Sequence, residues 1–321
     1  MQVPQAVRGM QRVEATVVRA ELDHGRGELV AERARPLEWT LLVDGTAQSH
    51  VDLADPVHLE FEYVRRIGHL LDALDPAPPE PLAVLHLGGG AWTLPRYVAA
   101  TRPRSTQRVI ELDGALVELV RTRLPVDGLG LDIRVADARA GLADAAAGAW
   151  DAVVLDVFAG ARIPAHLTSV EFLRVVAGAL RPGGVYVANL ADGAGGTRGM
   201  SGPNAANLDG VSGAGGRRAG DGSVPDRDVL AFARGQAATA AAVFGEVAVV
   251  AAPEVLHGRR FGNLVLVAGA TLPLVDVARR TAADPFPARV EPGPAFAADA
   301  AVVTDATAVP SPRPPVGLFG Q

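Results

Sequence analysis

The sequence predicts an α/β protein with a doubly wound, mostly parallel sheet and a small β-rich unit in front of it. Beyond Leu82, short apolar runs alternate with segments of helical periodicity, which is typical of a parallel sheet covered by helices on both faces. Residues 12–51 instead hold short strand-like runs, and an Asp44-Gly45 pair between two of them indicates a hairpin.

The composition narrows the classes of function. The chain has 321 residues, of which 49% are hydrophobic and 21% charged, as in an ordinary packed protein. A net charge of -6 argues against nucleic acid as a partner, and the absence of cysteine excludes disulfides and thiolate metal sites. No apolar run has the length of a membrane span, and the N-terminus lacks the apolar core of a signal peptide. We therefore expect no membrane association, no bound metal and a location in the cytoplasm.

The β-rich unit covers residues 1–54, and a helix is expected to follow it. Apolar residues recur at helical spacing across residues 59–74, and Asp55 before Pro56 has the features of a helix start. The proline-rich segment 76–81 then ends this helix.

The alternating unit supplies five strands with helices between them. The expected strands are residues 83–87, 107–112, 131–137, 150–156 and 183–190. The expected helices are residues 92–101, 114–124, 138–147 and 165–180. A ligand of such a sheet is expected beyond the carboxyl ends of the strands.

A glycine-rich segment interrupts the alternating unit. It has few apolar residues, which predicts a flexible insertion that does not contribute to the core. Two further helices and two strands are expected after it, at residues 228–244, 273–283, 246–252 and 262–269. The expected parts of the chain are a main domain of residues 55–190 and 226–290, the insertion at 191–225 and a loosely ordered Pro/Ala-rich tail at 291–321.

Three consecutive glycines, Gly88, Gly89 and Gly90, follow the first strand of the alternating unit. Thr93 stands where a dinucleotide-binding G-x-G-x-x-G turn has its third glycine, and the chain has no lysine for a phosphate-binding P-loop. A pyrophosphate cradle is therefore poorly supported, whereas a turn that lets the backbone approach a smaller ligand stays open. A tight turn without a ligand is the alternative.

Acidic residues end the next three strands. Glu111 follows the glycine turn by about 20 residues, where a carboxylate accepts hydrogen bonds from ribose hydroxyls. Asp113 lies on the same side of the segment, so one of the two is expected to face the ligand and the other to cap the next helix. Asp137, with the backbone of Ala138, is a candidate for binding an adenine ring. Asp156 is a candidate for orienting an amine or accepting its proton, with a helix cap as the alternative.

The order of the motifs LGGG, VIELD, AD, WDAVVLD and LRPGGVYV resembles class I S-adenosylmethionine-dependent methyltransferases, which have a Rossmann-like sheet. The segment LLVDGTAQSHVDLADPVHLEFEYV resembles the hairpin and first helix of spermidine synthases, the polyamine aminopropyltransferases. The resemblance implies S-adenosylmethionine or decarboxylated S-adenosylmethionine as co-substrate, and a small-molecule amine or other nucleophile as acceptor. It also implies nucleoside binding by Gln48, Glu111 and Asp137, and a catalytic role for Asp156.

The sequence departs from that family on the acceptor side. Ala91 stands where the family has an acid after its glycines, and Ala159 stands where its gate loop has a second acid. The polar triplet of the first helix is at best His58-Leu59-Glu60. Because two acids that would hold a cationic polyamine are missing, transfer to putrescine is expected to be weak. Arg259-Arg260 are interpreted as an exposed basic pair, with carboxylate binding as the alternative.

Three functions therefore stay open. The first is an aminopropyltransferase with an altered acceptor site, and the second is a small-molecule methyltransferase. The third is a non-catalytic relative that binds a nucleoside or only a protein partner. The oligomeric state also stays open, including a homodimer.

Overall fold

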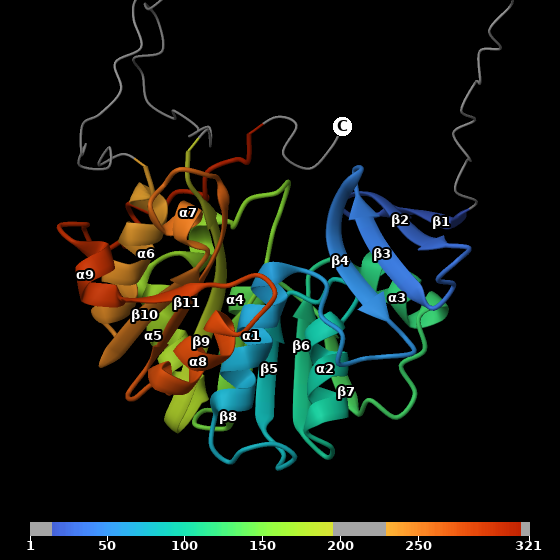
Figure 1. Cartoon of the computed structure of the whole chain (residues 1–321), viewed down its shortest axis with the longest axis horizontal. Helices are drawn as coiled ribbons and strands as arrows, with labels where there is room; N and C mark the ends of the chain where they lie inside the picture. The colour runs from blue at the N-terminus through green and yellow to red at the C-terminus, as the bar shows by residue number, and fades with distance from the viewer. Residues whose placement is uncertain (1–14, 195–228, 316–321) are drawn as a thin grey trace, which may run out of the picture.

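The computed structural model describes residues 15–194 and 229–315, and it confirms the predicted fold class (Figure 1). The N-terminal unit is an antiparallel sheet whose strands lie in chain order. These strands are β1 (Ala15–Leu22), β2 (Gly25–Glu32), β3 (Glu38–Val43) and β4 (Thr46–Asp52). Asp44 and Gly45 both have positive φ, 48° and 76°, so the turn between β3 and β4 has the conformation that a two-residue hairpin favours.

The main sheet has its strands in the order β12-β10-β11-β9-β8-β5-β6-β7. The parallel strands are β5 (Ala83–Leu87), β6 (Thr106–Glu111), β7 (Leu131–Val135), β8 (Trp150–Leu155) and β9 (Leu180–Asp192). The antiparallel edge consists of β10 (Glu246–Ala251), β11 (Gly262–Gly269) and β12 (Arg289–Pro292). The central strands are apolar because helices cover them on both faces.

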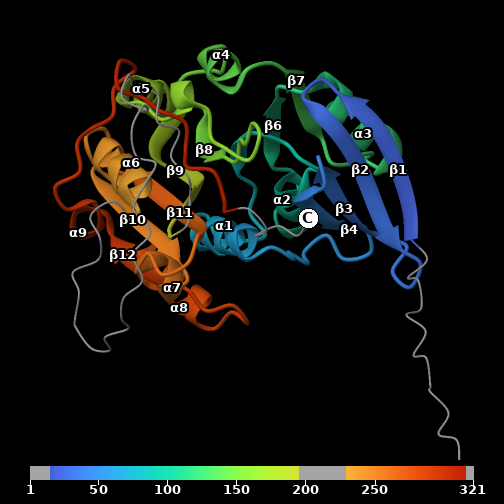
Figure 2. The ribbon, with the colours of Figure 1, turned by 90° about the horizontal axis from the view of Figure 1, so that it is seen from above.

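The helices form two layers over this sheet (Figure 2). One layer contains α1 (Glu62–Ala73), α2 (Thr93–Thr101) and α8 (Leu274–Ala282). The other contains α4 (Ala138–Ala143), α5 (Val170–Ala179), α6 (Ala231–Ala241) and α9 (Gly293–Ala297). A third apolar cluster joins α3 (Gly114–Arg123) to the N-terminal sheet. The described residues also form a 3-10 turn at Ala165–Leu167 and the short helix α7 (Pro253–Leu256).

The first helix begins later than the sequence predicts. Asp55 caps a turn, accepting from the N–H of Val57 at 3.3 Å, and α1 starts only at Glu62. Aspartate followed by proline favours a turn as well as a helix start, so the local signal did not separate the two. The later start places Tyr63 in the first turn of α1.

The described part of the tail, residues 291–315, is more ordered than its composition predicts. Strand β12 pairs with β10 along the edge of the main sheet, and α9 packs against α6. The chain then returns toward the segment between β8 and α5, where the N–H of buried Ser311 donates to the carbonyl of Ile163 at 3.1 Å. Tertiary contacts of this kind leave no periodic signal in a Pro/Ala-rich segment.

Other boundaries also differ from the prediction. Strand β9 continues to Asp192, so residues 191 and 192 belong to the sheet, and residues 195–225 of the predicted insertion lie outside the described residues. The helix expected at 138–147 ends at Ala143, and the helix expected at 165–180 divides into a 3-10 turn and α5. Within residues 15–194 and 229–315, no helix is both long and apolar enough to cross a bilayer.

Candidate active site

The glycine turn lies where the carboxyl ends of β5 and β8 meet. Gly88 has a φ of 90°, and a Cβ atom there would collide with the backbone carbonyl of Asp156, so only glycine fits. Glu111, at the end of neighbouring β6, accepts hydrogen bonds from the N–H of Gly89 at 2.8 Å and the N–H of Asp113 at 3.0 Å. The structure therefore brings together the turn and the acid that the sequence singled out.

Asp113 is buried and bonded to the backbone of two segments. Its carboxylate caps α3, accepting from the N–H of Leu116 at 2.8 Å. The same carboxylate accepts from the N–H groups of Asp23 and His24, between β1 and β2, at 3.2 and 2.9 Å. Of the two roles that the sequence left open for Glu111 and Asp113, we assign capping to Asp113.

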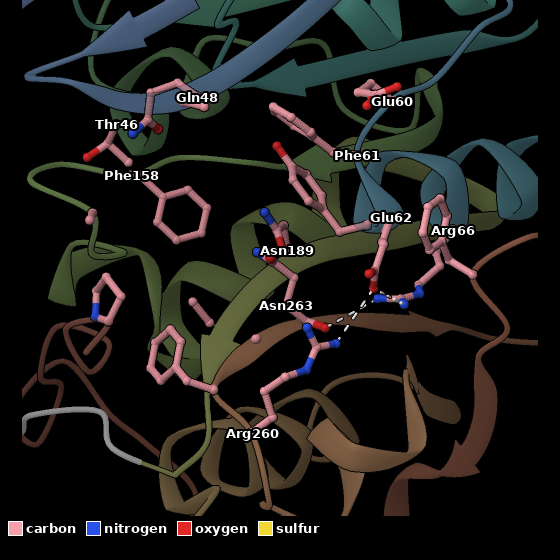
Figure 3. A pocket seen from close by; sticks show the side chains of 18 residues that line it. Thr46, Gln48, Glu60, Phe61, Glu62, Arg66, Phe158, Asn189, Arg260 and Asn263 are labelled. Atoms are coloured by element: carbon pink, nitrogen blue, oxygen red, sulfur yellow. Dashed lines mark hydrogen bonds and ion pairs between the residues drawn. The ribbon is translucent and has the colours of Figure 1, made fainter. Parts of the chain in front are cut away.

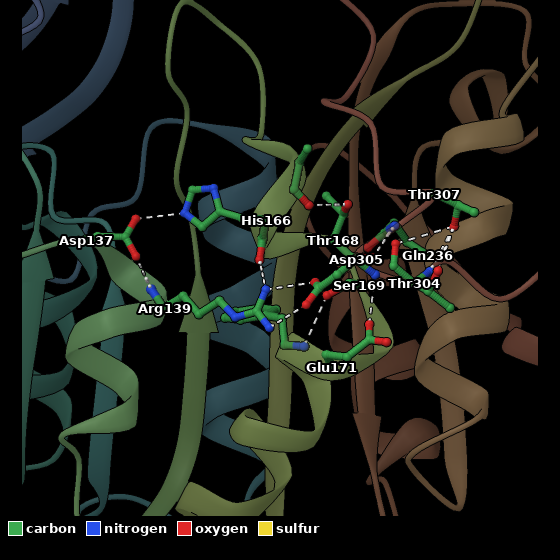
Figure 4. Close-up of polar contacts among 12 residues, drawn as sticks. Asp137, Arg139, His166, Thr168, Ser169, Glu171, Gln236, Thr304, Asp305 and Thr307 are labelled. Atoms are coloured by element: carbon green, nitrogen blue, oxygen red, sulfur yellow. Dashed lines mark hydrogen bonds and ion pairs between the residues drawn. The ribbon is translucent and has the colours of Figure 1, made fainter.

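Asp137 caps α4 and contacts a histidine from another element (Figure 4). One carboxylate oxygen accepts from the N–H groups of Arg139 and Ala140, each at 3.0 Å, and the other lies 2.7 Å from Nε2 of His166. Burial opposes the charged form, but hydrogen bonds from Ala140 and His166 outweigh it and hold the pKa of Asp137 below its ordinary value. Ala138 is buried in the first turn of α4.

Asp156 lies directly after β8 with a partner on each oxygen. Oδ1 accepts from Nδ2 of Asn189 at 2.9 Å, and Oδ2 accepts from the hydroxyl of Tyr63 at 3.2 Å. Burial raises the pKa of Asp156, and the charge of Glu111 acts in the same direction, whereas the hydrogen bonds from Asn189 and Tyr63 oppose the shift. A carboxylate with a raised pKa is suited to accept a proton near neutral pH.

A cavity of about 450 Å³ opens beside the partners of Asp156 (Figure 3). Tyr63 and Asn189 form part of its wall. Gln48 also faces this cavity, on the same side as Phe158 from the loop after β8. The cavity is lined by residues 46–48 of β4, residues 60–63 and 66 around α1, residues 158 and 161, residues 189 and 191 of β9, residues 260–263, and residues 286 and 314.

Three charged side chains occupy one part of the cavity wall. Nη2 of Arg66 contacts Oε2 of Glu62 at 2.8 Å, and Nη2 of Arg260 lies 3.9 Å from the same oxygen. Arg66 is only 3% exposed, whereas half of the side chain of Arg260 is exposed. Burial lowers the pKa of Arg66, the charge of Glu62 opposes this shift, and the charge of Arg260 adds to it.

The sequence did not predict several of these residues. The triplet His58-Leu59-Glu60 lies before α1, and His58 contacts Glu60 at 3.1 Å. The residue near the start of α1 that contacts Asp156 is instead Tyr63. Arg260, interpreted as an exposed residue, lines the cavity, and no local pattern could have shown this.

The chain is similar to known proteins in both sequence and structure. No protein-family model matches it. It is 31% identical over 147 residues to a polyamine aminopropyltransferase of Chromobacterium violaceum, which covers 45% of this chain and 54% of that protein. The chain thus matches about half the length of this curated relative.

The structural similarity extends over nearly the whole chain. A probable spermidine synthase from Corynebacterium glutamicum has a TM-score of 0.73 and 30% identity, with 90% of this chain and 96% of that chain covered. A spermidine synthase solved with the transition-state analogue AdoDATO has a TM-score of 0.53 and 18% identity, with 83% and 77% covered, which shows a shared fold alone. On the strength of the similarity along almost its full length, the chain belongs to the spermidine synthase family.

Proposed function

We propose that the protein transfers an alkyl group from an adenosyl sulfonium donor to a small-molecule amine. The observation that carries this proposal is the position of Asp156, which adjoins the glycine turn on one side and the cavity on the other. Its carbonyl lies against Gly88, and its carboxylate bonds to Tyr63 and Asn189 in the cavity wall. We also propose that the protein carries out this reaction in the cytoplasm.

The donor half of the site is supported by acceptor groups at successive strand ends. The carboxylate of Glu111 accepts two hydrogen bonds, from the N–H groups of Gly89 and Asp113. An ionised carboxylate can accept about four, so it can also accept from ribose hydroxyls. Asp137 and the backbone of Ala138 stand at the next strand end, where we place the adenine ring. A family relative crystallised with AdoDATO supports a donor of this class.

The reaction is a displacement at a carbon atom next to the positive sulfur. The lone pair of the amine nitrogen forms the new N–C bond, the C–S bond breaks, and its electron pair stays on sulfur to leave a neutral thioether. The nitrogen then loses a proton, which Asp156 accepts. Because Tyr63 and Asn189 fix the two carboxylate oxygens, Asp156 is positioned to hold the amine in line with that carbon.

Methyl transfer from S-adenosylmethionine is the second candidate, and one observation favours it. Ala91, directly after the glycine turn, is fully buried and offers no carboxylate to bind the ammonium of an aminopropyl group. Position 91 therefore supplies no acid that would favour the decarboxylated donor over S-adenosylmethionine.

The two donors can be tested separately on the full chain. Each is incubated with the protein and a panel of primary amines, and the thioether product is identified by mass spectrometry. Methylthioadenosine would show aminopropyl transfer, and S-adenosylhomocysteine would show methyl transfer. Asp156→Asn should lower kcat by about 10²- to 10⁴-fold while leaving nucleoside binding intact. Nucleoside binding without any thioether would indicate the non-catalytic relative, and no binding of either donor would overturn the proposal.

A further inference from the structure

The cavity beside Asp156 is polarised along one wall. Oδ1 of Asp156 accepts from Asn189 at 2.9 Å, and Oδ1 of Asn189 accepts from Nδ2 of Asn263 at 3.0 Å. The backbone carbonyl of Asn263 in turn lies 3.5 Å from Nη1 of Arg66. A continuous row of polar groups thus runs from a carboxylate at the reacting end to a guanidinium at the other end.

The far end carries more positive than negative charge. Arg66 is buried and makes the close contact to Glu62, at 2.8 Å. Arg260 lies 3.9 Å from the same carboxylate oxygen, and half of its side chain is exposed. The single carboxylate of Glu62 therefore pairs with the guanidinium groups of both Arg66 and Arg260 (Figure 3).

The neighbouring acids are already engaged elsewhere. Glu60, at the cavity wall, contacts His58 at 3.1 Å. Asp284 contacts Arg65 at 2.9 Å and His69 at 2.8 Å. Neither Glu60 nor Asp284 forms an ion pair with Arg260, so Glu62 is the partner of Arg260 among these acids.

We infer that the acceptor is an amino carboxylate, a small molecule with an amine at one end and a carboxylate at the other. The amine lies toward Asp156, and the carboxylate lies against the guanidinium of Arg260, whose planar donors match two carboxylate oxygens. A diamine would instead bring its second ammonium against the guanidinium of Arg260, and this like charge opposes binding. This inference rests on the proposed group transfer.

The rest of the cavity fits a short alkyl chain between two charged ends. Phe158, Phe261 and Phe286 line it and offer apolar surface to methylene groups. The chemistry is unchanged, because the amine nitrogen forms the bond to carbon, the C–S bond breaks, and the acceptor carboxylate stays intact. The product is an N-alkylated amino carboxylate and a thioether.

A matched pair of acceptors tests this inference, namely 4-aminobutanoate and putrescine. They share a primary amine on a short methylene chain and differ in the charge at the other end. With either donor, kcat/KM for 4-aminobutanoate should exceed that for putrescine by at least about tenfold, the value of one charge-assisted hydrogen bond. Arg260→Gln should raise KM for 4-aminobutanoate by about ten- to a hundredfold and leave KM for putrescine unchanged or lower. Arg260→Glu should reverse the preference.

Arg279→Gln is the matched control. Arg279 is an exposed arginine of α8 that contacts Asp276 one turn away, outside the cavity. Both acceptors should keep their kinetic constants in this variant. A wild-type preference for putrescine, or an equal effect of Arg260→Gln on both acceptors, would contradict the inference.

Binding decides the question even without turnover. The protein is saturated with methylthioadenosine and titrated calorimetrically with each acceptor. Binding of 4-aminobutanoate that is lost in Arg260→Gln supports the inference, and tighter binding of putrescine, or no binding of 4-aminobutanoate, overturns it. Failure of the proposed function has a different signature, since then neither sulfonium donor nor methylthioadenosine binds.

Discussion

At the scale of single residues, Asp156 combines features that a surface carboxylate lacks. Burial raises its pKa, while Tyr63 and Asn189 donate to its ionised form and limit the rise. The backbone carbonyl of Asp156 lies directly against Gly88. Its protonation state and its position therefore depend on three different segments of the chain.

This arrangement predicts the acid limb of the pH profile. Asp156 must be ionised to accept a proton, so kcat/KM should fall as the pH decreases through its raised pKa. Tyr63→Phe and Asn189→Ala each remove a donor to the ionised form, which raises that pKa further and moves the acid limb to higher pH.

The control for this experiment is Tyr186→Phe. Tyr186 is a buried tyrosine that stacks on Phe244, away from the cavity. Its removal should leave the limb in place. An acid limb that stays unchanged in both Tyr63→Phe and Asn189→Ala would show that another group controls it.

At the scale of elements, one carboxylate connects the two sheets. Asp113 caps α3 and at the same time accepts from the N–H groups of Asp23 and His24 between β1 and β2. Asp23 returns the contact by accepting from the N–H of Gly114 at 2.8 Å. These bonds hold the N-terminal sheet, and with it Gln48, against the domain that carries the glycine turn.

Asp113→Ala should therefore destabilise the protein by about 2–4 kcal/mol, because it removes a helix cap and leaves three backbone N–H groups without their acceptor. Chemical denaturation measures this change. Asp127→Ala, in an exposed loop after α3, serves as the matched control and should change the free energy of unfolding by less than about 0.5 kcal/mol. A loss of similar size in both variants would contradict the connecting role of Asp113.

At the scale of the whole molecule, the cavity is assembled from segments that are far apart in the chain. Its wall combines β4 of the N-terminal sheet, the start of α1, the loop after β8, the end of β9 and the start of β11. Pro314, from the C-terminal segment that returns past Ile163, completes it. The cavity therefore exists only once both sheets and this segment have docked.

A ligand that binds this assembled state should stabilise the entire fold. Methylthioadenosine at about 100 times its Kd should add about 2.7 kcal/mol to the free energy of unfolding, which thermal denaturation detects as a higher Tm. Glu111→Gln should abolish most of this increment, since the charged acceptor for the ribose is lost. Glu118→Gln, on the exposed side of α3, should retain it. An increment that persists in Glu111→Gln would exclude Glu111 from nucleoside binding.

The sequence by itself determined the alternation of strands and helices from β5 to β9, the β3–β4 hairpin and the positions of Gly88, Glu111, Asp137 and Asp156 at strand ends. These features follow from local rules, since periodicity, turn residues and strand ends are all written in neighbouring positions. Only the tertiary structure decided whether Glu111 or Asp113 caps α3, where α1 begins and how the C-terminal segment packs.

The set of residues that line the cavity was also decided by the tertiary structure. Tyr63 reaches Asp156 across 93 positions of sequence, and Arg260 meets Glu62 across more than twice that separation. Such pairs depend on how α1 and β11 dock on the sheet, which no local pattern records. The charge that we propose for the acceptor therefore depends on packing, whereas the strand ends where we propose the reaction to occur could be predicted from the sequence.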